Sequence, residues 1–159
     1  MKELYSTQSL FSFPKEGEGA CVTTNGMWKS NGDAVMGAGI ALEAQKNYMV
    51  ADLLGKYLQQ YGNRVFNLGL HPNLKTGETF RLFSFPTKHN WKLPSRIDLI
   101  KKSARELVEV CEKFGVQKCY LPPAGCTNGK LSYEKDVKPV LTEILDDRFI
   151  CVINKNFVK

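Results

Sequence analysis

Two glycine-rich stretches hold residue types that could bind a phosphate group. The first is Gly37-Ala38-Gly39, which follows a loop that begins at Asn25 and Gly26. Glycines let backbone amides approach a ligand closely, and the free amides at a helix N-terminus favour an anion. The second stretch, Ala124–Gly129, reads AGCTNG. Both stretches predict phosphate-binding loops, although a tight strand-to-helix turn needs the same small residues.

A third stretch, PTKHNW at residues 86–91, brings Lys88 and Trp91 close together in the chain. A lysine beside a sugar bond could act as a cation or, with a lowered pKa, as a nucleophilic amine. A solvated surface lysine is the alternative interpretation. Trp91 and Trp28 could stack on a base, or could cover the edge of the core.

The totals indicate one globular domain, residues 1–159, with 43% apolar and 24% charged residues. No apolar run is long enough to span a bilayer, and the N-terminus has no signal-peptide core. Five scattered cysteines without a CxxC pair and only two histidines predict neither disulfides nor a metal site, in a reduced cytoplasmic setting. We expect a monomer that uses no cofactor and contacts no membrane.

The net charge of +6 favours an anionic partner, which could be a nucleotide, a nucleic acid or an acidic protein surface. The basic residues are spread among acidic ones, so the charge alone does not establish nucleic-acid binding.

Strands alternate with helices along the first half of the chain. The patterns predict strands near residues 10–13 and at 20–24, a helix from Ala38, and a second helix that ends at Gly62. Two further strand-like runs, residues 64–70 and 79–85, are expected to pair.

The second half continues the alternation. Ser95 is the expected N-cap of a long amphipathic helix that ends at Gly115. A strand at 117–121, a last helix around residues 137–145, a strand at 149–153 and a polar tail at 155–159 follow. The alternation predicts an α/β layered domain whose two glycine-rich loops face one crevice at the carboxyl ends of the strands.

The sequence resembles the macrodomain family, whose members bind ADP-ribose. The resemblance is carried by TTNG with AVMGAGIAL in the first loop region and by GCTNGKL in the second. It implies a three-layer α/β/α macrodomain with a mixed central sheet. It also implies that ADP-ribose contacts Glu18, Thr24, Asn25, Gly26, Val35, Met36, Gly37, Ala38, Gly39, Ile40, Thr87, Pro123, Ala124, Gly125, Cys126, Thr127, Asn128 and Gly129.

Within these residues the resemblance implies separate roles. Glu18 would accept from the adenine amino group, Asn25 would face the distal ribose, and Gly37–Gly39 would hold the diphosphate. An Asx-type turn is the alternative interpretation of Asn25. Cys126 is interpreted as a small filler rather than a nucleophile.

PTKHNW resembles the PTK-x-x-W segment of DarG-type macrodomains, which places Lys88 near the anomeric carbon as a catalytic residue together with Asn25. The resemblance implies an ADP-ribosyl glycohydrolase that removes ADP-ribose from a macromolecule, with thymine-linked DNA as the expected substrate. Some relatives with a catalytic lysine carry an aspartate where Gly129 stands here. A non-catalytic module that binds ADP-ribose or a related nucleotide signal is therefore the alternative.

Overall fold

The structure, a computed structural model, describes residues 1–154. Its strands are β1 (Lys2–Tyr5), β2 (Gly19–Thr24), β3 (Asn67–Pro72), β4 (Thr79–Pro86), β5 (Cys119–Leu121) and β6 (Phe149–Ile153). Its α-helices are α1 (Gly39–Tyr48), α2 (Ala51–Tyr61), α3 (Ile97–Phe114) and α4 (Lys138–Ile144). A 3₁₀ turn covers Leu10–Ser12, and a π turn, Tyr133–Val137, leads into α4. The polar tail predicted at residues 155–159 lies outside the described residues.

The strands form one mixed sheet in the order β1-β6-β5-β2-β4-β3. Every neighbouring pair is parallel except β3 and β4, which pair antiparallel. The expected pairing of the third and fourth strands is thus confirmed. Because β2, β4 and β5 run parallel, the loops that follow them leave the same edge of the sheet, and this edge is where α/β proteins bind ligands.

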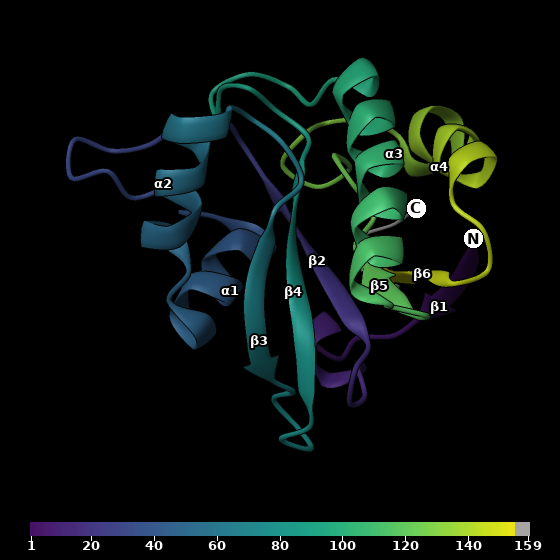
Figure 1. The fold of residues 1–159 in the computed structure, drawn as a ribbon. Helices are drawn as coiled ribbons and strands as arrows, with labels where there is room; N and C mark the ends of the chain where they lie inside the picture. The colour runs from purple at the N-terminus through teal and green to yellow at the C-terminus, as the bar shows by residue number, and fades with distance from the viewer. Residues whose placement is uncertain (155–159) are drawn as a thin grey trace.

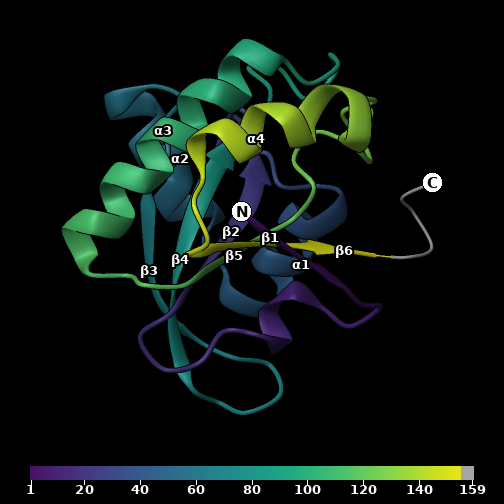
Figure 2. The ribbon, with the colours of Figure 1, turned by 90° about the vertical axis from the view of Figure 1, so that its right-hand side faces the viewer.

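Helices cover both faces of the sheet, so the predicted three-layer arrangement is confirmed. Figure 1 shows α1 and α2 on one side of the strands and α3 with α4 on the other. Figure 2, turned by 90°, shows α3 and α4 above the sheet and α1 below it. Each face has its own buried apolar cluster, one containing Phe83 and Leu107 and the other containing Leu54 and Phe80.

Glycines end two helices as predicted. Gly62 follows α2, and Gly115 follows α3 in the left-handed region, where its backbone amide donates to the carbonyls of Cys111 and Glu112. None of the helices in residues 1–154 is long and apolar enough to cross a bilayer.

Two local predictions are wrong, the strand near residues 10–13 and the N-cap at Ser95, and one strand was not predicted. The apolar run near residues 10–13 forms the 3₁₀ turn instead of a strand, because the Ser9 side chain accepts from the backbone amide of Phe11 and starts the turn. The strand β1, at residues 2–5, was not expected. Ser95 does not cap α3: Arg96 occupies the cap position, and Ser95 is buried.

Candidate functional site

A cleft of about 1020 Å³ opens at the carboxyl ends of β2, β4 and β5. Thr24 ends β2, Thr87 follows β4 and Pro122 follows β5, and all three residues line it. The volume is at the upper end of the range for ligand pockets, so the cleft has room for a ligand of dinucleotide size. Residues of both glycine-rich loops line this one cleft, as the sequence predicts.

The first loop is a hairpin that is fixed to α2. A bridge between Trp28 and Ala34 closes the hairpin, and the Ala34 amide donates to the Ala51 carbonyl at 2.8 Å. Gly55 of α2 lies directly against the hairpin, where a Cβ would overlap the Gly32 carbonyl. The hairpin can therefore pack on α2 only if residue 55 is glycine, and this packing determines where the chain re-enters the cleft.

The chain then reaches the N-terminus of α1 inside the cleft. Ala38 is the N-cap and makes no side-chain hydrogen bond to the helix, and the first turn contains no acidic residue. Gly37, Gly39 and Ile40 line the cleft beside it. The first-turn amides and the positive end of the helix dipole are therefore available to an anion.

The second loop lies against the first. A Cβ on Gly39 would stand 3.0 Å from Nδ2 of Asn128, so the two loops approach each other at α1. Gly125 has φ +77°, a left-handed conformation that glycine adopts without strain. Gly129 lies so close to Ser95 that a Cβ would overlap the serine hydroxyl. The glycines of this loop are thus required by its conformation and packing, as well as by its place in the cleft.

Lys88 lies at one end of the cleft. Its ammonium donates to the carbonyl oxygen of Asn128 at 3.1 Å and contacts the carbonyl oxygen of Trp91 at 3.5 Å. Burial and then the nearby charge of Lys130 lower the pKa of Lys88. The half-buried side chain is therefore not a fully solvated surface lysine, and its loss of a proton is easier than usual.

Two residues from other elements support the loop that carries Lys88. Asn63, just after α2, donates from Nδ2 to the Lys88 carbonyl at 2.9 Å, and this nitrogen lies 3.2 Å from Nδ1 of His89. The amide of Gly26 donates to the His89 carbonyl at 3.2 Å. The lysine loop is therefore tied both to α2 and to the start of the first loop.

The Asn25 side chain forms the Asx-type turn that was the alternative interpretation. Its Oδ1 accepts from the backbone amide of Met27 at 3.0 Å, and its Nδ2 donates to the carbonyl of Val35 at 3.0 Å. Asn25 also lines the cleft. An amide has a second proton and a second lone pair, so the turn leaves capacity for a ligand hydroxyl.

The end of the cleft remote from Lys88 is built from segments far apart in the sequence. Residues Ser6–Leu10, Glu43 of α1, Val152 of β6 and Asn154 line it. The Ser9 hydroxyl donates to Oε1 of the half-buried Glu43. Glu43 is the one carboxylate among the lining residues in the described part of the chain. This end combines an oriented carboxylate with the apolar side chains of Leu10 and Val152, which suits a nucleobase that carries an amino group.

Most of the residues expected to contact a ligand lie around this cleft. The lining residues among them are Thr24, Asn25, Val35, Gly37, Ala38, Gly39, Ile40, Thr87, Lys88, Pro123, Gly125, Cys126, Thr127, Asn128 and Gly129. Lining residues that the sequence interpretation did not include are Ser6, Thr7, Gln8, Ser9, Leu10, Thr23, Ala41, Glu43, Ser95, Pro122, Val152 and Asn154. Most of these are serines, threonines or other common residues, so residue type alone does not mark them as part of a site.

Four expected residues are not part of the lining. Glu18 immediately precedes β2 and therefore lies at the strand end opposite to the cleft, where its carboxylate accepts from the Lys15 amide. The expectation that Glu18 meets adenine is corrected on this ground. Met36 and Ala124 are buried in the core beneath the two loops, and Gly26 contacts the lysine loop.

The lining contains no activated thiol. Burial, and then the charge of Asp136, raise the pKa of Cys126 to about 12, and its Sγ donates to the Ala124 carbonyl. The thiol therefore stays protonated at neutral pH and is a poor nucleophile. Two buried hydroxyls beside the cleft, Thr24 Oγ1 and Ser95 Oγ, have no hydrogen-bond partner within the described chain. No cluster of potential metal ligands occurs among residues 1–154.

Comparison with known proteins gives no match to a family model. The chain is 30% identical over 116 residues to a DNA ADP-ribosyl glycohydrolase of Thermus aquaticus, a match that covers 70% of this chain and 31% of that protein. This chain therefore spans about a third of the length of that curated relative.

Solved structures share the fold. The macrodomain of Mycobacterium tuberculosis DarG superposes with a TM-score of 0.72 at 24% identity, over 96% of each chain. Thermosipho africanus DarTG, solved in complex with ADP-ribose, gives a TM-score of 0.73 at 19% identity, over 96% of this chain and 41% of that one.

Proposed function

We propose that this chain, a macrodomain that is similar to the macrodomains of DarG, removes ADP-ribose from DNA, with thymine-linked ADP-ribose as the substrate. The observation that carries the proposal is the position of the Lys88 ammonium. It lies at one end of a cleft whose middle is formed by two backbone-lined loops, and Glu43 lies toward the other end. In one extended ligand, Lys88 matches the scissile sugar bond, the two loops match the diphosphate, and Glu43 matches the adenine base.

The diphosphate lies between the two loops in this proposal. The uncapped first turn of α1 supplies backbone amides and a positive dipole end, and no acidic side chain in that turn opposes an anion. Gly37 lines the cleft and places no side chain there, and a Cβ at this position would meet no protein atom within 4 Å. Phosphate oxygens are therefore held by backbone groups, and their charge needs no lysine or arginine in the middle of the cleft.

Adenine lies at the end that contains Glu43. The carboxylate can accept from the exocyclic amino group, while Ser9 holds its other oxygen. Leu10, Ile40 and Val152 supply apolar surface for the ring. Glu43 thus takes the role that the sequence interpretation gave to Glu18.

Lys88 then lies beside the bond between C1″ of the distal ribose and the base nitrogen. Two chemical routes are open to it. As an ammonium it stabilises the negative charge that develops on the leaving base, while water adds to C1″. As a neutral amine, which its lowered pKa favours, it attacks C1″ and the bond from C1″ to the base nitrogen breaks; the base leaves with the proton that the amine loses, and water then replaces the amine at C1″. Asn25 uses its remaining proton and lone pair to hold the ribose hydroxyls.

A non-catalytic reader of ADP-ribose is the second candidate, and one observation favours it. Glu43 is the one carboxylate that lines the cleft in the described residues, and it belongs to the end remote from Lys88. No acid in the lining is therefore placed to assist the lysine. The same loops could also sequester a related nucleotide signal.

The decisive experiment measures single-turnover release of ADP-ribose from an ADP-ribosylated thymidine oligonucleotide. We expect release by the wild-type protein, and loss of release with retained ADP-ribose affinity in Lys88→Ala. Lys118→Ala, a lysine substitution near the opposite end of the sheet, is the matched control. Equal rates for Lys88→Ala and wild type would refute the catalytic role, and binding without release in wild type would identify a reader.

Calorimetry separates the remaining ligand classes. ADP-ribose, ADP-ribose 1″-phosphate and cyclic derivatives are titrated in turn, and heat for another nucleotide with none for ADP-ribose would identify a different signal. We further propose that the protein acts as a monomer in the cytoplasm. Five free cysteines fit a reducing compartment.

A further inference from the structure

The mouth of the cleft at Lys88 has an aromatic and basic border outside the space for ADP-ribose. Three exposed residues form it: Trp91, Lys92 and Lys130, which we call the outer mouth. Trp91 is 49% exposed and also lines the cleft. Its carbonyl contacts the Lys88 ammonium, so the indole belongs to the loop that adjoins the scissile bond.

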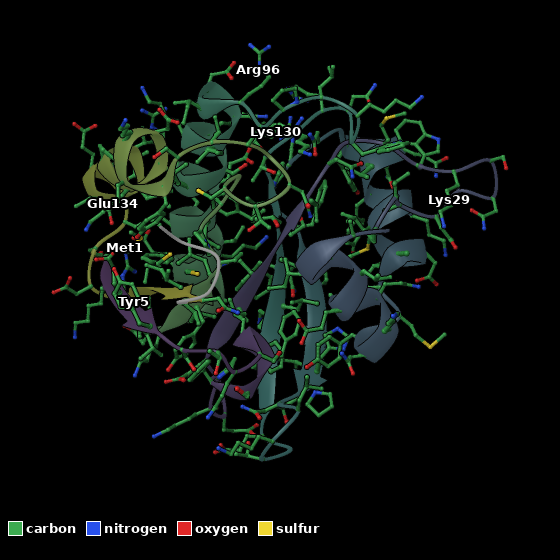
Figure 3. The ribbon with its side chains drawn as sticks, turned by 180° about the vertical axis from the view of Figure 1, so that it is seen from behind. Met1, Tyr5, Lys29, Arg96, Lys130 and Glu134 are labelled. Atoms are coloured by element: carbon green, nitrogen blue, oxygen red, sulfur yellow. The ribbon has the colours of Figure 1, made fainter. Side chains whose placement is uncertain are left out.

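The charges of the outer mouth are available to a partner. Neither Lys92 nor Lys130 forms a salt bridge within the described part of the chain. Arg96 lies at the same end of the molecule, but Asp98 offsets its charge through a 3.0 Å ion pair. Figure 3 shows Lys130 and Arg96 near the same edge, and the acidic Glu134 lies away from them.

The two lysines belong to the two segments that meet at Lys88, because Lys92 follows Trp91 and Lys130 follows the second loop. Lys92 places its ammonium 5.5 Å from the centre of the Trp91 ring, on one face of the indole. Lys130 directly follows the second loop, two residues after Asn128, whose carbonyl accepts from the Lys88 ammonium at 3.1 Å. The charge of Lys130 also lowers the pKa of Lys88. A macromolecule attached at C1″ beside Lys88 would therefore leave the cleft near Trp91, Lys92 and Lys130.

From this arrangement we propose that the outer mouth binds a single-stranded nucleic acid on either side of the modified base. A base next to the modified one stacks on the face of Trp91 that Lys92 leaves open, and the two lysines contact phosphates. Paired bases in a duplex cannot offer a free ring face to the indole, so the surface selects an unpaired strand. The proposal extends the proposed function by naming the surface that recognises its macromolecular substrate.

The test uses an unmodified strand, so that it does not depend on ADP-ribose release. Fluorescence anisotropy measures the affinity of a labelled 12-mer of thymidine across a salt series. We expect weak, salt-dependent binding that Trp91→Ala reduces about 5- to 150-fold and that Trp91→Phe largely retains. Lys92→Ala and Lys130→Ala should each flatten the salt slope by about 0.7.

Lys118→Ala is the matched control, because the Lys118 ammonium also lies over an aromatic ring, 5.8 Å from the centre of Tyr120, at the other end of the sheet. It should leave both affinity and slope unchanged, and thermal unfolding checks that every variant folds. The proposal is overturned if the strand does not bind, if Trp91→Ala binds as tightly as wild type, or if a duplex binds equally well. Loss of ADP-ribose release with intact strand binding would count against the proposed function alone.

Discussion

Gly37→Ala should separate ligand binding from folding more cleanly than any other substitution in the cleft. Gly37 lies in the first loop and lines the cleft, yet a Cβ there meets no atom within 4 Å. Its φ is outside the positive range that disfavours other residues. The variant should therefore keep or gain stability, by about 0.4–1 kcal/mol, because alanine has fewer conformations in the unfolded chain.

Because Gly37 lines the cleft and its Cβ would meet no protein atom, we expect the added methyl group to occupy open space beside the proposed diphosphate. If it moves a phosphate away from one charge-assisted hydrogen bond, the loss is about 1.5–3 kcal/mol. That loss raises the Kd for ADP-ribose about 10- to 150-fold. Gly129→Ala provides the contrast, because its Cβ would overlap Ser95 and should lower stability as well as affinity.

Calorimetry with ADP-ribose and thermal unfolding of the same samples measure the two effects. Wild-type affinity in Gly37→Ala would refute the position of the diphosphate between the loops. A large fall in the unfolding temperature would show instead that Gly37 has a structural role that the packing does not reveal.

Three further predictions concern the pKa of Lys88, the support of the loop that carries it, and the packing of the first loop on α2. Lys130→Gln removes a charge that lowers the pKa of Lys88, so the pKa of Lys88 should rise. The limb of the pH–rate profile that belongs to Lys88 should then move to higher pH, and an unmoved limb would argue against Lys88 as the titrating group. Asn63→Ala removes the 2.9 Å hydrogen bond to the Lys88 carbonyl and should slow the release of ADP-ribose about tenfold, with little change in ADP-ribose affinity. An equal loss of release rate and affinity would indicate a general structural role. Gly55→Ala should lower the free energy of unfolding by about 1–3 kcal/mol in denaturant titration, because its Cβ overlaps the Gly32 carbonyl; an unchanged midpoint would contradict this packing.

The sequence predicted the middle of the site better than its ends. Gly37–Gly39 and Ala124–Gly129 each follow a strand, and the carboxyl ends of parallel strands meet at one edge, so local patterns were sufficient to bring the loops together. The end of the cleft that contains Glu43 could not be predicted in this way. It combines Ser9, Glu43 and Val152, which only the packing of α1 against the sheet brings together.

The wrong predictions have physical causes. The family resemblance implies a ligand contact for Glu18, but Glu18 precedes β2 and the cleft lies where β2 ends, so the residue is at the opposite end of the strand. The run near residues 10–13 has apolar residues that suit a strand, but the Ser9 side chain accepts from the Phe11 amide and stabilises a 3₁₀ turn instead. Ser95 has the residue type of an N-cap, yet the close approach of Gly129 buries it beneath the second loop.

A crystal structure with bound ADP-ribose tests the central claim most directly. The account predicts that the diphosphate lies between Gly37–Gly39 and Gly125–Gly129, the adenine amino group meets Glu43, and C1″ lies about 3–4 Å from the Lys88 ammonium. A ligand bound outside this cleft, or bound within it with C1″ remote from Lys88, would contradict the account.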